Sequence, residues 1–254
     1  MTKKVLITGM SGLIGGILKE HLLEAGGYEL TALNRRGVEG IRTVRADISD
    51  LEDIMPAFEG QDTVVHLAAY LGSQDWEGQH AGNVLGTYNV FEAARRAGAS
   101  RVIFASSGNA IRGFERVPPY SDIASGNYDK VPPDFRRLTH HDVRPEALYG
   151  AAKVWGEALA RHFSDDYGMS MICVRIGSVT QGNRPRTMRE NAIYLSHHDV
   201  ATHLKACIDA PDDLKFDIFF AVSNNKWNYR DLTHPKEVLG WEPRDSADDY
   251  PFTE

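Results

Sequence analysis

Three side chains have the types and spacing needed to remove a proton from a hydroxyl group. Tyr149 and Lys153 lie four residues apart in a segment with helical periodicity, so one helical turn places the phenol and the ammonium on one face. A phenol is a poor base near neutral pH because its pKa is about 10, but a cation held close by lowers that pKa. Ser107 follows an apolar run and could hydrogen-bond the reacting oxygen. The three residues therefore predict general-base catalysis.

A glycine-rich turn near the amino end lies between an apolar run over 5–8 and a helical segment. Gly9 and Gly12 would let a pyrophosphate approach the N–H groups that begin the helix, and Gly15 would let the helix pack on the strand. A tight turn without a ligand is the alternative, but the strand–turn–helix context favours a dinucleotide, whose chemistry is hydride transfer. The expected contacts in this turn are Gly9, Ser11, Gly12, Leu13, Ile14 and Gly15.

Apolar runs of strand length alternate with helical segments along the chain. Near-continuous apolar strands between helices predict a parallel sheet covered on both faces, the doubly wound α/β or Rossmann fold. We expect 1–254 to form a single domain, with 1–176 as the dinucleotide-binding core and 177–254 as a small substrate-binding region that completes the sheet. The expected strands are 5–8, 28–33, 41–46, 63–68, 101–105, 170–176 and 216–222, and the expected helices after the first are 51–58, 84–96, 147–167 and 200–210.

Two irregular stretches, 108–146 and 177–195, interrupt this alternation. Each follows an expected strand, and long loops beyond strand ends are where such folds place ligand contacts. The first stretch is also long enough to act as a lid over a pocket.

Charge and cysteine content exclude several classes of protein. The net charge of −7 argues against a general nucleic-acid binder, whose footprint would be basic. The apolar stretch at 64–71 is too short to span a bilayer, and Cys173 and Cys207 cannot form a disulfide framework. We therefore expect a cytoplasmic protein that binds neither nucleic acid nor membrane.

No metal is predicted. The adjacent pairs 140–141 and 197–198 are histidines whose side chains would diverge on a helix, and no Cys, Asp or Glu set accompanies them at ligand spacing. Capping or surface roles fit them better.

The spacing Thr-Gly-x-x-Gly-x-x-Gly over 8–15 resembles the extended short-chain dehydrogenase/reductase family, which includes NAD-dependent epimerases and dehydratases. The resemblance runs from residue 3 to about 242 and implies that Lys153 also holds the nicotinamide ribose and that Asp47 touches the adenine. Other cofactor contacts that it implies are Ile48, Leu67, Ala68, Ala69, Asn83, Tyr149 and Ile176.

The end of the second strand predicts which nicotinamide cofactor is preferred. NAD enzymes place a carboxylate there for the ribose 2′-hydroxyl, whereas this chain has Asn34, Arg35 and Arg36. Two guanidiniums can bind a 2′-phosphate, although they could also be a solvated pair. We expect NADP to be preferred, with NAD possible.

The region after residue 176 resembles uronate dehydrogenases and related archaeal sugar-phosphate dehydrogenases. That resemblance implies that Ser178 and Arg186 bind the anionic end of the substrate, and that Ser73 and Asn109 lie near the sugar hydroxyls together with Ser107. The chain departs from uronate dehydrogenases in having Asn34 for an acidic residue and in the residues after Ser107, which leaves the substrate's identity open.

The leading hypothesis is a dehydrogenase that oxidises the anomeric carbon of an anionic monosaccharide (a uronic acid, sugar phosphate or sulfosugar) to a lactone. A carbonyl reductase or epimerase of the same family is the second, and a non-catalytic dinucleotide sensor is the third. The family often pairs the helices expected at 84–96 and 147–167 across a dimer interface, so we expect a homo-oligomer.

Overall fold

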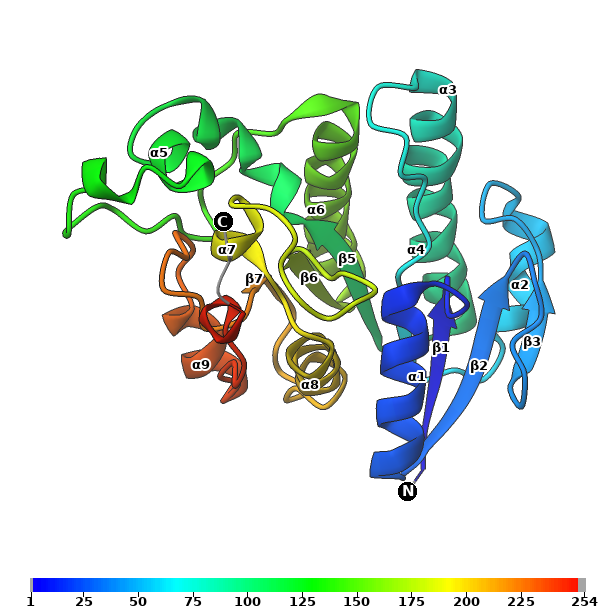
Figure 1. The fold of residues 1–254 in the computed structure, drawn as a ribbon. Coiled ribbons are helices and arrows are strands. Elements are labelled where there is room, and N and C mark those ends of the chain that lie inside the picture. Colours follow the sequence, from blue (N-terminus) through cyan, green and yellow to red (C-terminus); the bar gives the residue numbers. More distant parts are fainter. Residues whose placement is uncertain (1, 251–254) are drawn as a thin grey trace.

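The computed structural model describes residues 2–250, which form one seven-stranded parallel sheet (Figure 1). Its strand order is β3-β2-β1-β4-β5-β6-β7, so the order reverses between β1 and β4. In such sheets the ligand crevice lies beyond the strand ends at this reversal. The strands are β1 (Lys3–Thr8), β2 (Tyr28–Asn34), β3 (Arg42–Arg45), β4 (Thr63–His66), β5 (Arg101–Ser107), β6 (Ser170–Ile176) and β7 (Phe216–Ala221).

Helices cover both faces of the sheet and bury two apolar cores. On one face, Leu18 and Leu22 of α1 (Leu13–Ala25) pack with Leu204 of α8 (His197–Ile208), and α9 (Thr233–Leu239) adds partly buried residues. The opposite core includes Phe91 and Phe163, and the helices that line it are α2 (Leu51–Phe58), α4 (Gly86–Ala97) and α6 (Ala147–Tyr167). The predicted doubly wound fold is confirmed.

Several predicted boundaries agree with the structure to the residue, such as 51–58, 147–167 and 170–176. The helix expected over 84–96 is different, because α4 is preceded by a π-helical turn, η1 (His80–Leu85), and by α3 (Trp76–Gln79). The helix expected over 200–210 begins earlier, because the Ser196 hydroxyl accepts the Asp199 N–H and caps α8.

The long stretch after β5 packs against the carboxyl-terminal part of the chain. Ile111, Tyr120 and Leu138 share a third apolar core with Ile193 and Tyr229. The short helices of this part are η2 (Gly108–Ala110), η3 (Arg112–Arg116), α5 (Tyr120–Ser125), η4 (Tyr128–Lys130), α7 (Glu190–Ile193) and η5 (Ala247–Asp249). The 108–146 stretch is thus a packed layer beside the strand ends, and not an open loop.

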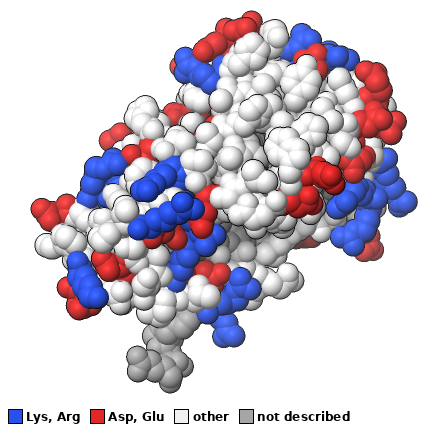
Figure 2. All heavy atoms as spheres, turned by 90° about the horizontal axis from the view of Figure 1, so that it is seen from above, with Lys and Arg blue, Asp and Glu red and all other residues white. Residues whose placement is uncertain are grey.

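Positive and negative side chains are interspersed on the face seen in Figure 2. This face offers no broad basic surface of the kind that tracks a nucleic-acid backbone. Within residues 2–250, no helix combines the length and apolar character needed to cross a membrane.

Candidate active site

A cleft of about 830 Å³ lies at the carboxyl ends of the central strands, where the strand order reverses. It brings together the glycine turn, the end of β2, the segment after β4, and the three residues predicted to be catalytic. All of the cofactor contacts predicted from the sequence line it except Asn83; these are Gly9, Ser11, Gly12, Leu13, Ile14, Gly15, Asn34, Arg35, Arg36, Asp47, Ile48, Leu67, Ala68, Ala69, Tyr149, Lys153 and Ile176.

The glycine turn has the close packing and the free N–H groups that a pyrophosphate site needs. Gly9 has a φ of +72°, and a Cβ there would lie 2.8 Å from the backbone nitrogen of Ala68. A Cβ at Gly15 would lie 2.5 Å from the Cα of Met10. No side chain caps the start of α1 at Gly12, so the N–H groups of its first turn face the cleft.

The end of β2 carries a donor that fits a nucleotide. Asn34 is buried, and its Nδ2 has no hydrogen-bond partner among residues 2–250. An orphaned buried amide is costly, and a ribose or phosphate oxygen in the cleft would satisfy it. Arg35 and Arg36 are exposed beside it, and the Arg35 charge helps to lower the pKa of Asp47 after the hydrogen bonds from Ser49.

Lys153 is a buried cation directly below the predicted base. Only 3% of the residue is exposed, and its Nζ lies 5.5 Å from the centre of the Tyr149 ring and 4.8 Å from that of Phe104. Burial lowers the pKa of Lys153 to about 8, although Glu157 opposes this. The ammonium is therefore a charge held in an apolar setting, where its effect on neighbours is strong.

The pKa of Tyr149 differs from the sequence-based expectation. Burial raises it above the ordinary value of 10, while a hydrogen bond with the Ser107 side chain lowers it in part. The structure thus corrects the expectation that a nearby Lys153 brings the pKa of this phenol toward the working range, because the pKa is raised and not lowered. Desolvation of the phenolate is the largest cause of the raised pKa.

A buried ion pair fixes the helix that carries Tyr149 and Lys153. Glu157, one turn after Lys153, accepts two hydrogen bonds from Arg175 of β6 at 2.8 Å, and it also accepts the Ser106 hydroxyl of β5 at 2.5 Å. These contacts join α6 to both strands beside Ser107. They hold the predicted catalytic groups on rigid elements.

A neutral histidine holds the ends of β1 and β4. Burial lowers the pKa of His66 to about 3. The Thr8 Oγ1 accepts the N–H of Ala68 at 3.1 Å and lies within hydrogen-bond distance of Nδ1 of His66, at 2.8 Å. This network positions the segment 67–69 along the cleft.

Two predicted site residues, Asn83 and Ser73, do not line the cleft. Asn83 is buried and bonds the backbone of Tyr70 in both directions, through Oδ1 at 2.9 Å and Nδ2 at 2.7 Å. The exposed Ser73 does not line the cleft, but its carbonyl accepts the Tyr149 N–H at 3.3 Å. Both residues shape the cleft through the backbone, and the structure does not bring their side chains to it.

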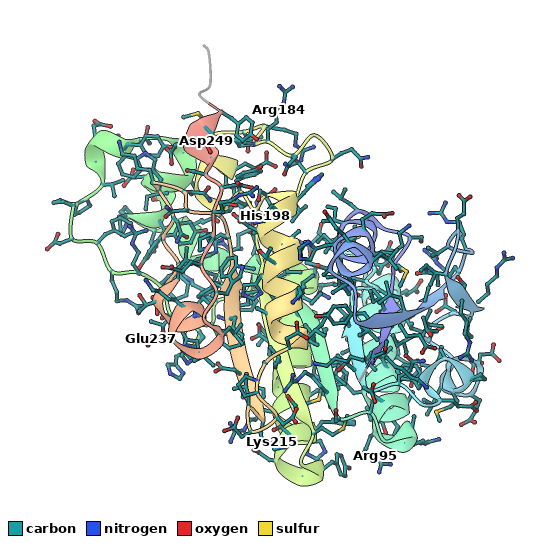
Figure 3. The ribbon with its side chains drawn as sticks, turned by 90° about the horizontal axis from the view of Figure 1, so that it is seen from below. Arg95, Arg184, His198, Lys215, Glu237 and Asp249 are labelled. Atoms are coloured by element: carbon teal, nitrogen blue, oxygen red, sulfur yellow. The ribbon has the colours of Figure 1, made fainter. Side chains whose placement is uncertain are left out.

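The predicted anion-binding arginine is also displaced. Arg186 does not line the cleft; its side chain is 67% exposed and pairs with Glu190 at 3.1 Å. Arg184, nearby, lies at the periphery in Figure 3. Arg189 instead reaches a smaller pocket of about 170 Å³. The short α7 turns this part of the loop inward, which residue spacing alone could not show.

The smaller pocket shares four lining residues with the cleft, namely Ser107, Ile176, Gly177 and Ser178. Asn109 lines it as predicted for a substrate contact, together with Gly108, Ile193 and Arg230. Arg230 is a residue that sequence reasoning missed. The only sequence feature that could have drawn attention to Arg230 is its position next to Tyr229 in a polar segment.

The structure gathers one histidine cluster that the sequence did not indicate. His140, Asp217 and His234 present ligand atoms within 4.8 Å of one another. His234 Nε2 is 2.7 Å from the Asp217 carboxylate, and its ring stacks on His140. The sequence spacing offers His140 no set of acidic ligands, and the fold supplies Asp217 from a distant segment.

Comparisons with known proteins agree with this geometry. Residues 5–198 match the model of the NAD dependent epimerase/dehydratase family. The NAD-dependent glucose-6-phosphate dehydrogenase of Haloferax volcanii is 29% identical over 99% of this chain and 97% of its own length. The L-arabinose 1-dehydrogenase (NAD(P)(+)) of the same organism is 30% identical over 96% of this chain and 97% of its own.

Among solved structures, a mutant uronate dehydrogenase from Agrobacterium tumefaciens, complexed with NAD, superposes with a TM-score of 0.81. It is 30% identical and covers 98% of this chain, which covers 87% of that one. The family model spans more than half of the chain, and the fold and the cleft agree with it. The chain therefore belongs to the NAD-dependent epimerase/dehydratase family.

Proposed function

We propose that this protein is an NAD(P)-dependent dehydrogenase that oxidises the anomeric carbon of an anionic monosaccharide to a lactone. The observation that carries the proposal is that Ser107, Tyr149 and Lys153, from β5 and α6, line one cleft with the glycine turn. The relatives named for glucose 6-phosphate and for uronate support an anionic sugar.

The protein's own groups account for the proton. The Tyr149 oxygen removes the proton of the anomeric hydroxyl while Ser107 hydrogen-bonds the same oxygen and fixes its position. Lys153 stabilises the phenolate form of Tyr149, which can accept this proton, at a place where burial makes the phenolate charge costly. A nicotinamide held in the cleft would supply the hydride acceptor for the same carbon.

NADP is the cofactor that we propose as preferred. The orphaned Nδ2 of Asn34 and the exposed guanidiniums of Arg35 and Arg36 are donors, and none of the three is a carboxylate that would repel a 2′-phosphate. A higher kcat/KM with NAD than with NADP would contradict this preference.

A cofactor-reduction screen over glucose, its uronic acid, its 6-phosphate and its 6-sulfonate tests the function, with L-arabinose as a neutral comparison. We expect reduction with at least one anionic sugar. Tyr149→Phe keeps the ring and removes the titrating oxygen, so turnover should fall by about 10²–10⁴-fold while cofactor binding, followed by fluorescence, persists. Near-normal turnover in this variant would contradict the role of Tyr149.

The same screen separates the alternatives. An epimerase would convert its sugar without net cofactor reduction, and a carbonyl reductase would prefer an unrelated ketone. A non-catalytic sensor would bind the dinucleotide, but no sugar in the screen would reduce it. The half-buried Tyr149 beside the buried Lys153 argues against a non-catalytic sensor, because such a protein would gain nothing from an ammonium whose burial is costly.

We also propose a homodimer through the outer faces of α4 and α6, where Tyr88 and Tyr167 are exposed aromatic residues. Light scattering should give twice the mass of the chain, and a monomer would refute the proposed dimer.

Cys173 and Cys207 are buried and unbridged, which supports the expected cytoplasmic location.

A further inference from the structure

The smaller pocket contains a buried guanidinium with unused donors. Arg230 is 2% exposed, and its Nη2 donates to the Tyr229 hydroxyl at 3.2 Å. Among residues 2–250, neither Nε nor Nη1 of Arg230 has a hydrogen-bond partner. A charged group removed from water without partners is strongly unfavourable, so a ligand that supplies acceptors is expected.

Two other buried arginines of the same chain show how unusual this is. Arg101 bonds Ser170 Oγ and the carbonyls of Ile208, Ala210 and Pro211, and so uses all three of its nitrogens. Arg175 also uses all three, two on Glu157 and one on the carbonyl of Asp142. Both are structural cations in which every guanidinium nitrogen has a hydrogen-bond partner. Arg230 differs from them in facing a pocket.

The charges around the pocket leave a positive excess. Arg189 makes a bidentate pair with Glu115 at 2.6 and 2.8 Å, and the Tyr229 hydroxyl donates to the same carboxylate. Arg112 pairs with Glu146 at 2.6 Å. Glu190 accepts the hydroxyl of Ser178 and pairs with Arg186 at 3.1 Å. These three carboxylates thus pair with three guanidiniums, and Arg230 is a fourth guanidinium that makes no ion pair within residues 2–250.

The backbone beside the predicted catalytic serine leaves room for Arg230. A Cβ at Gly108 would lie 3.2 Å from Arg230 Nη2 and 3.5 Å from the carbonyl oxygen of Ile176. The guanidinium therefore reaches the residue next to Ser107. A ligand held by Arg230 would extend directly to the predicted reaction centre.

We propose that Arg230, together with Arg189, binds a tetrahedral oxyanion of the sugar, a phosphate or a sulfonate. This inference rests on the proposed function and names the substrate class. The two guanidiniums come from different segments and line one small pocket. In a guanidinium, the N–H of Nε points in the same direction as one N–H of Nη2, whereas Nη1 lies on another edge. The free Nε and Nη1 of Arg230 therefore donate in different directions. Three terminal oxygens pointing in different directions suit such donors better than the two coplanar oxygens of a carboxylate.

The experiment compares kcat/KM for glucose 6-phosphate, 6-deoxy-6-sulfoglucose, glucuronate and glucose in the wild type and in Arg230→Met. We expect a three-oxygen substrate to be preferred over glucuronate. The preferred substrate identifies the source of the oxyanion, phosphate or sulfonate. Arg230→Met should lower the ratio of anionic to neutral efficiency by roughly 10- to 100-fold, the effect of one or two charged hydrogen bonds. A preference for glucuronate, or an unchanged ratio, would overturn the proposal.

Arg101→Met is the matched control, because it also removes a buried arginine but lies at the far end of β5. It should lower the midpoint of thermal unfolding and leave that ratio unchanged. A drop as large as in Arg230→Met would assign the effect to lost stability and overturn the proposal.

Binding of inorganic phosphate and sulfate, measured by calorimetry, separates this inference from the proposed function. If no sugar reduces the cofactor, the dehydrogenase proposal fails, while anion binding that is lost in Arg230→Met still supports the site. If the sugars react but neither anion binds the wild type at millimolar concentration, the site fails and the function stands. The wild-type measurement also decides the matter if Arg230→Met does not fold.

Discussion

Replacing Lys153 by methionine should stabilise the protein while removing its activity. Burial lowers the pKa of this lysine from 10.5 to about 8, so at neutral pH the folded state holds an ammonium that it disfavours. At about 1.4 kcal/mol per pH unit, the difference corresponds to about 3 kcal/mol at pH 7. Methionine fills similar space without the charge, so the free energy of unfolding should rise by up to that amount.

The pH dependence of this gain gives a sharper test. Between pH 8 and 10.5 the unfolded lysine keeps a proton that the folded one has lost, so wild-type stability rises with pH in this window. The gain in free energy of unfolding that Lys153→Met gives over the wild type should therefore be largest below pH 8 and vanish by about pH 10.5. Urea unfolding of both proteins at pH 7 and pH 10 measures this gain.

Lys205→Met is the control. Asp209 raises the pKa of Lys205, so removing the Lys205 ammonium should slightly destabilise the fold. A Lys153→Met protein less stable than wild type at pH 7 would refute the reasoning.

Two further predictions concern the cofactor and the buried ion pair. Arg36→Ala should raise the Kd for NADP by roughly 10-fold, a moderate effect because Arg36 is exposed and its charge is screened. The Kd for NAD should stay nearly unchanged. Equal effects on both cofactors in titrations would contradict a role of Arg36 in binding the 2′-phosphate. Arg175→Met leaves Glu157 charged and buried without its partner, so the free energy of unfolding should fall by about 3–5 kcal/mol. Urea unfolding checks this value, and adding Glu157→Gln should recover part of the loss.

The fold was predictable because each element carries its own pattern. The apolar runs of β4, β5 and β6 are continuous, as two-sided burial requires, and the glycine turn marks the join of β1 and α1. The π-helical turn at 80–85 was not predictable. It depends on how Gln79 and Asn83 bond the backbone of Tyr70, a contact between segments that periodicity does not encode.

The site was predictable where a motif fixes the geometry and not where tertiary packing does. Lys153 and Tyr149 lie on one helix, so their spacing alone places them together. Arg186 and Arg189 are three residues apart in a loop, and only the position of α7 decides which of them faces the pocket. Arg230 reaches the pocket from the carboxyl-terminal segment, after β7 has completed the sheet.

Buried cations in this chain divide into those that the fold neutralises and those that it leaves for a ligand. Every guanidinium nitrogen of Arg101 and of Arg175 has a hydrogen-bond partner, and both side chains join secondary-structure elements. The fold does not neutralise Lys153 and Arg230 in this way. Burial lowers the pKa of Lys153, and two nitrogens of Arg230 have no hydrogen-bond partner among residues 2–250. Both of these line the connected pockets around Ser107. Destabilising charge is thus concentrated where a developing phenolate and an anionic substrate would offset it, which is the arrangement expected of a catalytic cleft and not of a structural core.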